Sequence, residues 1–256
     1  MIKGIANQSL VAVRREPSES SEMINQLLFG ETFTIIENYS SWFRIISNID
    51  SYEGWIDNKL VELLPDDSPI NNANPKVANS LFLAKKNGSN YPIRLCPGSS
   101  IYGYENGHFI AGADTYQCIE NPISEINSNN IDELIRVAKL FVNSPYLWGG
   151  RSPYGIDCSG FTQVVFKIVG HSIPRDAGQQ VKLGETVDFV NMAQPGDLAF
   201  FDNDEEIITH VGIIIDNGKI IHSSGYVKIE SIDHQGIFSV NTQKYSHKLR
   251  VIKRIL

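Results

Sequence analysis

Short runs of apolar residues, alternating with polar ones in the manner of β-strands, fill the first half of the chain. β-Branched and aromatic residues dominate these runs, and clusters of Gly, Asn, Asp and Ser separate them. The runs occupy residues 10–14, 32–37, 42–47 and 54–56, and then 81–84, 93–96, 101–104, 108–111 and 115–119. A polar, proline-rich stretch at residues 65–78 lies between the two sets. The sequence therefore predicts two small all-β barrels, residues 1–64 and 79–126, joined by a linker.

The hydrophobic period changes at residue 131. Apolar residues then recur every three or four positions as far as residue 141, which indicates an amphipathic helix, and residues 160–169 form a second helical stretch. A loop rich in Gly and Pro separates the two helices. Strand-like runs follow at residues 198–201, 210–215, 219–222, 227–229 and 248–255. We therefore expect residues 127–256 to form an α+β domain in which helices pack on an antiparallel sheet.

Composition and charge exclude several classes of protein. The 256 residues carry 22 basic and 29 acidic side chains, a net charge of −7, and no dense cluster of Lys and Arg, so no nucleic-acid partner is expected. No apolar run approaches the ~18 residues of a membrane-spanning helix, so no membrane partner is expected. Residues 1–8 lack the apolar stretch of about 7–15 residues found in secretory signals. We expect a cytoplasmic monomer without cofactor or metal, or a periplasmic or secreted protein if a signal peptide has been removed.

Cys158 lies where a glycine-rich loop, residues 144–156, runs into the second predicted helix. Unpaired N–H groups and the positive dipole at a helix start stabilise a thiolate, and the same N–H groups can hold an oxyanion. The alternative is a small buried cysteine that packs under the loop. Cys96 and Cys118 fall in predicted strands, where we expect them to be structural. Three cysteines without a CxxC spacing predict neither a disulfide framework nor a zinc knuckle.

His210 and His222 flank the turn of a predicted hairpin and could supply a base for the thiol and a partner that orients the base. A three-residue loop closed by Gly218, or a bulge, would place both imidazoles on one face of the sheet, whereas a two-residue turn would place them on opposite faces. The alternatives are two structural histidines or a metal site, although no fourth ligand is spaced to complete a zinc shell. The histidines in no motif are expected to be structural: His108, His171, His234 and His247.

Several motifs together resemble a known family. They are PYLWGGRSPYGIDCSGF at residues 145–161, PRD at 174–176, PGDL at 195–198, HVGI at 210–213 and IH at 221–222. In order and spacing they resemble the NlpC-type family of papain-like cysteine peptidases over about residues 130–256. YEGW at 52–55 and QLLFGE at 26–31 are similar to the bacterial SH3-like domain of members that cleave γ-D-glutamyl–diamino acid bonds, the dipeptidyl-peptidase VI type. Residues 79–126 resemble a second SH3-like domain loosely. The resemblance implies a papain-like catalytic domain preceded by two SH3-like barrels.

The resemblance also implies a role for each matching residue. Cys158 would be the nucleophile, His210 the general base and later acid, and His222 the residue that orients the base. Tyr146 would help the backbone N–H of Cys158 to hold the oxyanion. Asp157 would pair with the free α-amino group of an N-terminal L-Ala, or would serve as the helix cap. Further residues implied to bind substrate are Trp148, Ser159 and Asp176 of the catalytic domain and Tyr52 and Glu22 of the first SH3-like domain.

The amine end of the implied site, where the free α-amino group of the N-terminal L-Ala would bind, depends on the first SH3-like domain. Tyr52 would close it, and Glu22 would supply a second carboxylate, with Glu19 and Glu53 as alternatives. The other interpretation is that Tyr52 is only a barrel residue and that these acids are solvated charges. Ala177 stands where related sequences often carry Ser, so a hydrogen bond from that hydroxyl is absent or is supplied by water. This departure bears on substrate affinity more than on the reaction.

These roles imply a cysteine endopeptidase that hydrolyses the γ-D-glutamyl–diamino acid bond, with meso-diaminopimelate or L-Lys, in peptidoglycan-derived peptides with a free N-terminal L-Ala. Such peptides arise in murein peptide recycling, and the net negative charge suits small fragments better than an acidic wall. One alternative is a secreted hydrolase that docks on intact peptidoglycan through its SH3-like domains. Another is a non-catalytic wall-binding protein. An acyltransferase that discharges an acyl-enzyme to an amine or alcohol is a third.

Overall fold

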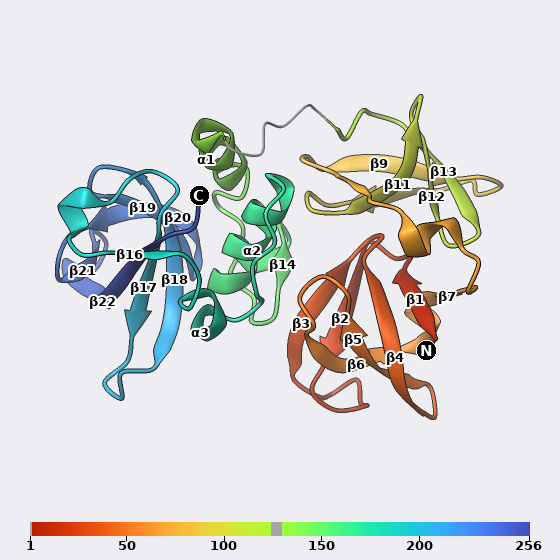
Figure 1. The fold of residues 1–256 in the computed structure, drawn as a ribbon, viewed down its shortest axis with the longest axis horizontal. Helices are drawn as coiled ribbons and strands as arrows, with labels where there is room; N and C mark the ends of the chain where they lie inside the picture. The colour runs from red at the N-terminus through yellow and green to blue at the C-terminus, as the bar shows by residue number, and fades with distance from the viewer. Residues whose placement is uncertain (1, 124–129) are drawn as a thin grey trace. The chain divides into compact units, whose positions relative to one another are not determined.

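The computed structural model describes residues 2–123 and 130–256, which divide into two compact units. The N-terminal unit comprises Met1–Glu125 together with Trp148–Ser152, and the C-terminal unit comprises Ile126–Leu147 and Pro153–Leu256. Figure 1 shows the course of the chain through each unit. The domain boundary predicted between residues 126 and 127 lies outside the described residues.

A seven-stranded antiparallel sheet forms the first part of the N-terminal unit, in the order β3-β2-β6-β5-β4-β1-β7 (Figure 1). Its strands are β1 (Lys3–Ala6), β2 (Leu10–Arg14), β3 (Met23–Leu28), β4 (Thr32–Tyr39), β5 (Trp42–Ser47), β6 (Glu53–Asp57) and β7 (Val61–Leu64). Alternate residues of β2 are buried, as the sequence pattern predicts, and they join a core cluster. The core cluster consists of Ala6, Val11, Val13, Leu27, Phe33, Ile45 and Ile56. Strands β1, β3 and β7 were not predicted; in β3 the buried positions include Asn25 and Gln26, which interrupt the apolar pattern.

A six-stranded antiparallel sheet follows, in the order β10-β9-β13-β12-β11-β8. Its strands are β8 (Lys76–Val77), β9 (Phe82–Lys86), β10 (Pro92–Leu95), β11 (Ser100–Glu105), β12 (His108–Ala111) and β13 (Asp114–Cys118). Phe29, which follows β3, packs edge-on against Phe109 and Tyr116 in the core of this second sheet. Ile70, from the segment predicted as a linker, is buried in the same core. The two sheets therefore share side chains. The SH3-like nature of the second sheet stays a prediction, as do the domain limits at residues 64 and 79.

The C-terminal unit is built on a second seven-stranded antiparallel sheet, in the order β16-β22-β17-β18-β19-β20-β21. Strand β21 also pairs with β22, which closes the sheet on itself. The strands of the sheet are β16 (Glu185–Val187), β17 (Leu198–Asp202), β18 (Ile208–Asp216), β19 (Lys219–Ser224), β20 (Tyr226–Ile232), β21 (Gly236–Ser239) and β22 (Lys244–Arg254). Two short strands precede it, β14 (Arg151–Ser152), which belongs to the N-terminal unit, and β15 (Gly155–Ile156). The helices are α1 (Ile131–Lys139), α2 (Cys158–Ile168) and α3 (Ala177–Gln180).

Helix α2 is a core helix that packs against β18 and β19 (Figure 1). All of its residues except Lys167 are buried. The apolar residues from Phe161 to Ile168 explain part of this burial, and the buried polar side chains of Thr162 and Gln163 are hydrogen-bonded within the C-terminal unit. Helix α1 packs against α2 and is amphipathic, with the side chain of Asn130 accepting hydrogen bonds from the first turn. Both predicted helices are confirmed, and α2 begins two residues earlier than predicted, at Cys158.

Strands predominate over helices among the described residues, so the α+β class predicted from the sequence is not confirmed as a description of the chain. The predicted arrangement of helices against an antiparallel sheet is present within the C-terminal unit. In residues 2–123 and 130–256, none of the helices has the length and apolar character needed to cross a membrane.

Candidate active site

Cys158 is the first residue of α2, and it is almost completely buried. Asp157 caps the helix, because its carboxylate accepts a hydrogen bond of 2.7 Å from the backbone N–H of Gly160. The Sγ atom of Cys158 lies 3.9 Å from the carbonyl oxygen of Thr209 on β18. The thiol therefore lies against the strand residue that precedes His210.

Burial dominates the electrostatics of this thiol. Burial, and then the charge of Asp157, raise the pKa of Cys158 to about 12, against smaller opposing contributions from backbone N–H groups and from Arg175. The helix start alone was expected to favour the thiolate, but loss of hydration outweighs it. The resting form is the thiol, so the site needs a base to remove its proton.

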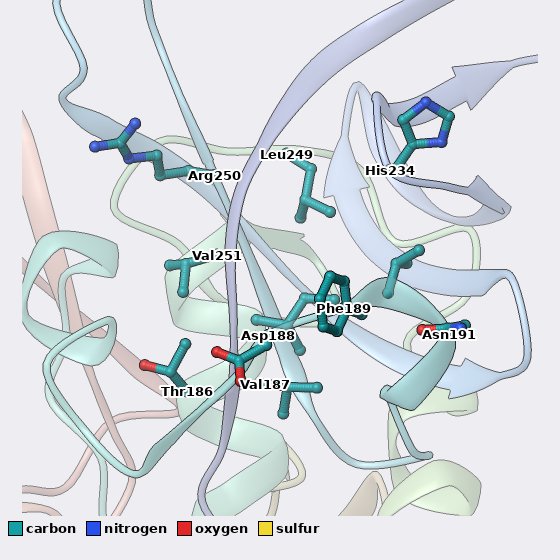
Figure 2. Close-up of a pocket in the computed structure, with 11 residues that line it drawn as sticks. Thr186, Val187, Asp188, Phe189, Asn191, His234, Leu249, Arg250 and Val251 are labelled. Carbon is teal, nitrogen blue, oxygen red and sulfur yellow. The ribbon is translucent and has the colours of Figure 1, made fainter.

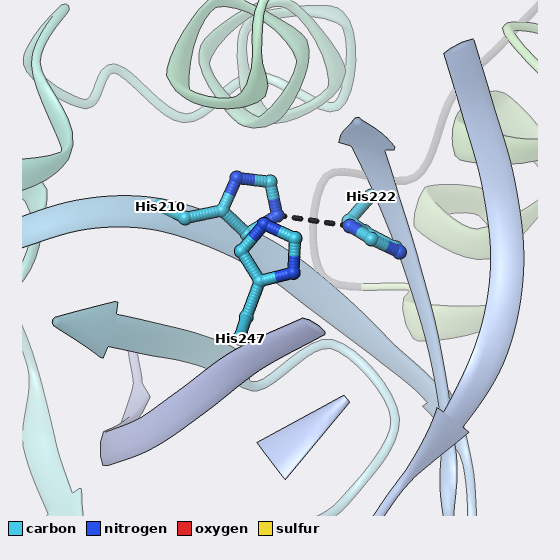
Figure 3. Close-up of side chains that lie close together, drawn as sticks. All are labelled: His210, His222 and His247. Carbon is cyan, nitrogen blue, oxygen red and sulfur yellow. Dashed lines mark hydrogen bonds between the residues drawn. The ribbon is translucent and has the colours of Figure 1, made fainter. Parts of the chain in front are cut away.

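His210 on β18 and His222 on β19 lie on the same face of the sheet. Gly212 pairs with His222, which makes His210 the diagonal neighbour of His222, and the register shifts at a bulge between Ile214 and Asp216. Nε2 of His210 lies 2.9 Å from Nδ1 of His222, and both rings are buried (Figure 3). The bulge is one of the two arrangements under which a shared face was predicted, and that prediction is confirmed.

Glu230 on β20 extends the line of hydrogen bonds beyond His222. Its Oε2 atom lies 3.0 Å from Nε2 of His222 and 3.3 Å from Nζ of Lys228. The hydrogen bond from His222 is the main cause that lowers the pKa of Glu230 to about 2, so this carboxylate is ionised. Sequence reasoning missed Glu230, because it is buried while its neighbour Ile229 is exposed, the reverse of what their polarity suggests.

His247 on β22 also belongs to this cluster. Its ring stacks on that of His210, with ring centroids 4.1 Å apart and planes 26° apart (Figure 3). Burial, and then the charge of His222, lower the pKa of His247 to about 4. From the sequence, His247 is expected to be structural, because it lies in no motif. Its contact with His210 depends on the pairing of β22 with β17 and β21, which local sequence does not reveal.

The loop before Cys158 is held by β19, the strand that carries His222, and by Gly225, the residue that follows this strand. The backbone N–H of Tyr146 donates to the carbonyl oxygen of Gly225, between β19 and β20, at 2.9 Å. The hydroxyl of Ser223 donates to the carbonyl oxygen of Ile156 at 2.7 Å. Burial, followed by electrostatic contributions from Cys158 and Asp157, raises the pKa of Tyr146 to about 12. Its phenol is therefore a hydrogen-bond donor at neutral pH.

Arg175 holds the residues on either side of Cys158. Its guanidinium donates to both carboxylate oxygens of Asp157 and, at 2.9 Å, to the hydroxyl of Ser159. Arg175, Asp157 and Ser159 are buried, whereas Asp176 is exposed at the start of α3. Arg175 lies in the PRD motif at residues 174–176, but no role could be predicted for it, since the partner of an arginine is not visible in sequence.

Glu22, predicted to bind the substrate amine, and Trp148, predicted to line the pocket, meet within the N-terminal unit. The indole Nε1 of Trp148 donates to Oε1 of Glu22 at 2.8 Å, and the other carboxylate oxygen of Glu22 accepts from Arg15 at 2.8 Å. The hydrogen bonds from Arg15 and then from Trp148 lower the pKa of Glu22. Trp148 is 58% exposed, so its ring is available to a ligand.

The alternatives to Glu22 have other partners. Glu19 pairs with Arg14 at 3.2 Å, and Glu53 pairs with Arg44. Tyr52 is half-buried, and its backbone N–H donates to the side chain of Asp50 at 3.0 Å. Of the three acids considered, Glu22 is the one that contacts Trp148.

The segment Trp148–Ser152 is anchored in the N-terminal unit by a buried ion pair. Arg151 donates to both carboxylate oxygens of Glu31, at 2.7 and 3.0 Å, and its backbone N–H donates to the side chain of Gln26 at 2.8 Å. Gly149 has φ of +75°, and a Cβ there would lie 2.6 Å from the carbonyl oxygen of Met23. Glycine is therefore needed for this close approach.

A pocket of about 610 Å³ lies elsewhere on the C-terminal unit (Figure 2). It is lined by residues 186–191, His234 and residues 249–252. None of the predicted site residues lines it, and its lining contains no cysteine, so it offers no nucleophile of the kind found at Cys158. The candidate active site is therefore the cluster around Cys158 and His210.

Comparison with known proteins agrees with this geometry. Residues 143–250 match the NlpC/P60 family, and residues 13–59 match the bacterial dipeptidyl-peptidase SH3 domain. The gamma-D-glutamyl-L-lysine dipeptidyl-peptidase of Bacillus subtilis is 33% identical over 215 residues, which cover 77% of this chain and 71% of the relative. The protein of the same name from Bacillus cereus is 27% identical over 238 residues, 80% of this chain and 68% of the relative.

A solved structure shows the same fold. The crystal structure of an NlpC/P60 family protein from Bacillus cereus superposes with a TM-score of 0.82 at 21% identity and covers 99% of both chains. One assignment follows from the cysteine at a helix start, the paired histidines, the family match and the similarity to relatives over most of the chain. The chain belongs to the NlpC/P60 family of cysteine peptidases and carries a bacterial dipeptidyl-peptidase SH3 domain ahead of its peptidase domain.

Proposed function

We propose that this protein is an endopeptidase that hydrolyses the γ-D-glutamyl–diamino acid bond of peptidoglycan-derived peptides with a free N-terminal L-Ala, in murein peptide recycling. The observation that carries the proposal is the buried Cys158, whose Sγ lies 3.9 Å from the carbonyl oxygen of Thr209, in the same unit as the hydrogen-bonded pair of His210, the next residue, and His222. The relatives named gamma-D-glutamyl-L-lysine dipeptidyl-peptidase support the choice of bond.

In the first half of the proposed reaction, His210 accepts the proton of the Cys158 thiol as the sulfur attacks the γ-carbonyl carbon of D-glutamate. The carbonyl oxygen becomes an oxyanion, which the backbone N–H of Cys158 and the phenol of Tyr146 stabilise. The carbon–nitrogen bond then breaks, and His210 gives its proton to the leaving amine of the diamino acid. The product is a thioester between the dipeptide and Cys158.

In the second half, water replaces the leaving amine. His210 takes a proton from the water as the water oxygen attacks the thioester carbon. The carbon–sulfur bond breaks, the proton returns to sulfur, and the L-Ala-D-Glu dipeptide leaves with a new carboxylate. His222 keeps the ring of His210 oriented through the hydrogen bond of 2.9 Å.

Recognition of the free amine is proposed to use two carboxylates that are each held by an arginine. Arg175 holds Asp157, and Arg15 holds Glu22. An ammonium group would form charge-assisted hydrogen bonds with such acceptors, whereas an acylated nitrogen has no positive charge. Tyr52 is proposed to close this end of the site, and the other proposed pocket residues are Trp148, Ser159 and Asp176.

The setting of this activity is also a proposal. We propose a cytoplasmic monomer without cofactor, in which residues 79–126 form a second SH3-like domain. A secreted hydrolase of intact peptidoglycan, a non-catalytic wall-binding protein and an acyltransferase are the alternatives. The buried hydrogen-bonded histidines beside Cys158 favour a catalytic protein over one that only binds.

Mass spectrometry of peptide cleavage tests the function. We would incubate wild type and Cys158→Ala with L-Ala-γ-D-Glu-L-Lys, with the meso-diaminopimelate analogue, and with the N-acetylated form of each. Cleavage of only the free peptides, lost in the variant, is the expected result. Equal cleavage of the acetylated peptides would favour a hydrolase of intact wall. If no peptide is cut, the proposed substrate is wrong, and wall binding or acyl transfer would be examined next.

A further inference from the structure

Glu230 takes no direct part in the proposed reaction, yet it is a buried, charged side chain. It pairs across the strands with Ile220, which places it on the same face of the sheet as His222, and it is 9% exposed. A carboxylate in such surroundings is costly unless it is hydrogen-bonded and paired. Its partners are Nε2 of His222 at 3.0 Å and Nζ of Lys228 at 3.3 Å.

The hydrogen bonds of this carboxylate determine where the ring protons lie. An ionised carboxylate can only accept hydrogen bonds, so Nε2 of His222 carries a proton. Burial lowers the pKa of His222, so at pH 7 its ring is neutral and has one N–H. Nδ1 of His222 is then an acceptor, and Nε2 of His210, which lies 2.9 Å away, must be the donor.

The same reasoning extends to His210. Burial, and then the charges of His247, His222 and Lys228, lower the pKa of His210 well below its usual value, so this ring is also neutral at pH 7. Its single proton is on Nε2, and the lone pair that can accept a proton is on Nδ1.

We propose that Glu230 is a positioning residue that sets the tautomers of His222 and His210, so that Nδ1 of His210 is the proton acceptor. This inference rests on the proposed thiol–imidazole chemistry. Without the carboxylate, His222 could carry its proton on Nδ1 and donate to Nε2 of His210. The proton of a neutral His210 would then be on Nδ1, and that nitrogen could not take the proton of Cys158.

The other groups around His210 do not select a tautomer. The groups that contact His210 or act on it are Phe201 on β17, His222 on β19, Lys228 on β20 and His247 on β22. Cys158 lies against the carbonyl oxygen of Thr209, the residue before His210, and Glu230 contacts His222. His247 stacks on the ring face and so constrains the ring plane but not the position of the proton. Lys228 disfavours protonation of both imidazoles through its charge without contacting a ring nitrogen of either in a hydrogen bond.

A metal site is the competing interpretation of the same cluster. Nitrogen atoms of His210, His222 and His247 lie within 4.8 Å of one another. The rings of His210 and His247 are stacked, however, so their in-plane lone pairs cannot converge on one ion at about 2.0–2.1 Å. Nδ1 of His222 is already in a hydrogen bond with His210. The geometry therefore favours proton positioning over chelation.

Nitrogen-15 NMR of the histidine side chains reads the tautomers directly, without substrate. In wild type at pH 7, we expect His222 and His210 each to carry the proton on Nε2. Single substitutions of His210 and His222 by Gln assign the signals. A wild-type spectrum that places the proton of His222 on Nδ1 would overturn the proposal, whatever the variants do.

Variants then test the role of the carboxylate. Glu230→Leu removes the acceptor, and we expect mixed tautomers and a fall in kcat of about 100-fold or more with little change in KM, as for other wrong-tautomer variants. Glu230→Gln keeps an oxygen that can accept from His222, and we expect kcat within about tenfold of wild type. Lys228→Met removes a charge but keeps the carboxylate, and we expect unchanged tautomers. Circular dichroism reports whether each variant is folded.

Alkylation of Cys158 by iodoacetamide, followed by peptide mass spectrometry, separates this inference from the proposed function. If wild type cleaves none of the peptides but shows the expected tautomers, and Glu230→Leu alkylates more slowly, the substrate assignment fails and the role of Glu230 holds. Unchanged tautomers, alkylation and kcat in a folded Glu230→Leu would overturn the role of Glu230 alone.

Discussion

Arg175 donates hydrogen bonds to both carboxylate oxygens of Asp157, the residue next to Cys158 in the chain. The side chains of both residues are buried, with 2% and 6% of their surface exposed. Asp157 at the same time caps the helix that begins at Cys158. The ion pair therefore connects the start of this helix to the segment before α3.

Loss of one partner of this ion pair should destabilise the fold. Arg175→Gln leaves Asp157 buried without its charge partner, and we expect the free energy of unfolding to fall by about 3–5 kcal/mol. Urea denaturation at pH 7 measures this free energy of unfolding. The double variant Asp157→Asn, Arg175→Gln carries no unpaired charge and should recover part of the loss. An Arg175→Gln variant as stable as wild type would show that the ion pair contributes nothing.

The reactivity of Cys158 should keep rising with pH. Because burial raises the pKa of its thiol to about 12, the thiolate fraction should grow about tenfold per pH unit between pH 7 and 10. The rate of iodoacetamide alkylation at Cys158, followed by peptide mass spectrometry, measures this. A rate that levels off near pH 7 would instead indicate a stable thiolate–imidazolium pair.

The raised pKa of Cys158 also affects stability in alkali. The unfolded chain releases the thiol proton near the usual pKa of 9.0, whereas the folded chain retains it until about 12. This contribution to stability is therefore present below pH ~9 and is lost as the pH rises towards 12. Cys158→Ala should lose less stability than wild type over that interval in urea denaturation.

His247 should make the fold sensitive to acid. Its pKa is lowered to about 4, so between pH 6.5 and 4 the unfolded chain binds a proton that the folded chain does not. Stability contributed by the neutral ring is present above pH 6.5 and falls by up to about 1.4 kcal/mol per pH unit as the pH decreases. His247→Phe keeps an aromatic ring against His210 and should show a shallower loss in denaturation at pH 4–7. His108→Phe, at an exposed site on β12, should leave the slope unchanged.

Glu22 should contribute to discrimination between free and acylated substrates. If its carboxylate receives the ammonium group, Glu22→Gln should lower the ratio of kcat/KM for free over N-acetylated peptide by about tenfold or more, the usual value of a charged hydrogen bond. Competition between the two peptides, read by mass spectrometry, gives this ratio. Glu19→Gln is the matched control, because Glu19 pairs with Arg14 instead. An unchanged ratio in Glu22→Gln and in Tyr52→Phe would rule out this role for the first barrel.

Local sequence was sufficient for several parts of the structure. The apolar pattern of β2 and β5 and the helical period of α1 were recognisable, because each depends on which side of one element is buried. Helix α2, which is buried on all sides, was recognisable from the spacing of its apolar residues. It was not sufficient for β3, whose buried Asn25 and Gln26 interrupt the pattern. Gln26 is buried because it binds the backbone of Arg151, a contact across 125 residues.

Around Cys158, too, some features were recognisable from local sequence and others depended on how the strands pair. The sequence by itself determined that a cysteine follows a glycine-rich loop at a helix start and that two histidines flank a turn, since these features are local in the chain. Whether the histidines share a face depended on the bulge between Ile214 and Asp216, which strand pairing decides.

Only the tertiary structure brought Glu230, His247 and Arg175 to the site, because their partners lie on other strands or helices. It also reversed the expected ionisation of the thiol. The helix start is a local feature that favours the thiolate, whereas the burial that opposes it is a property of the whole packed unit and prevails.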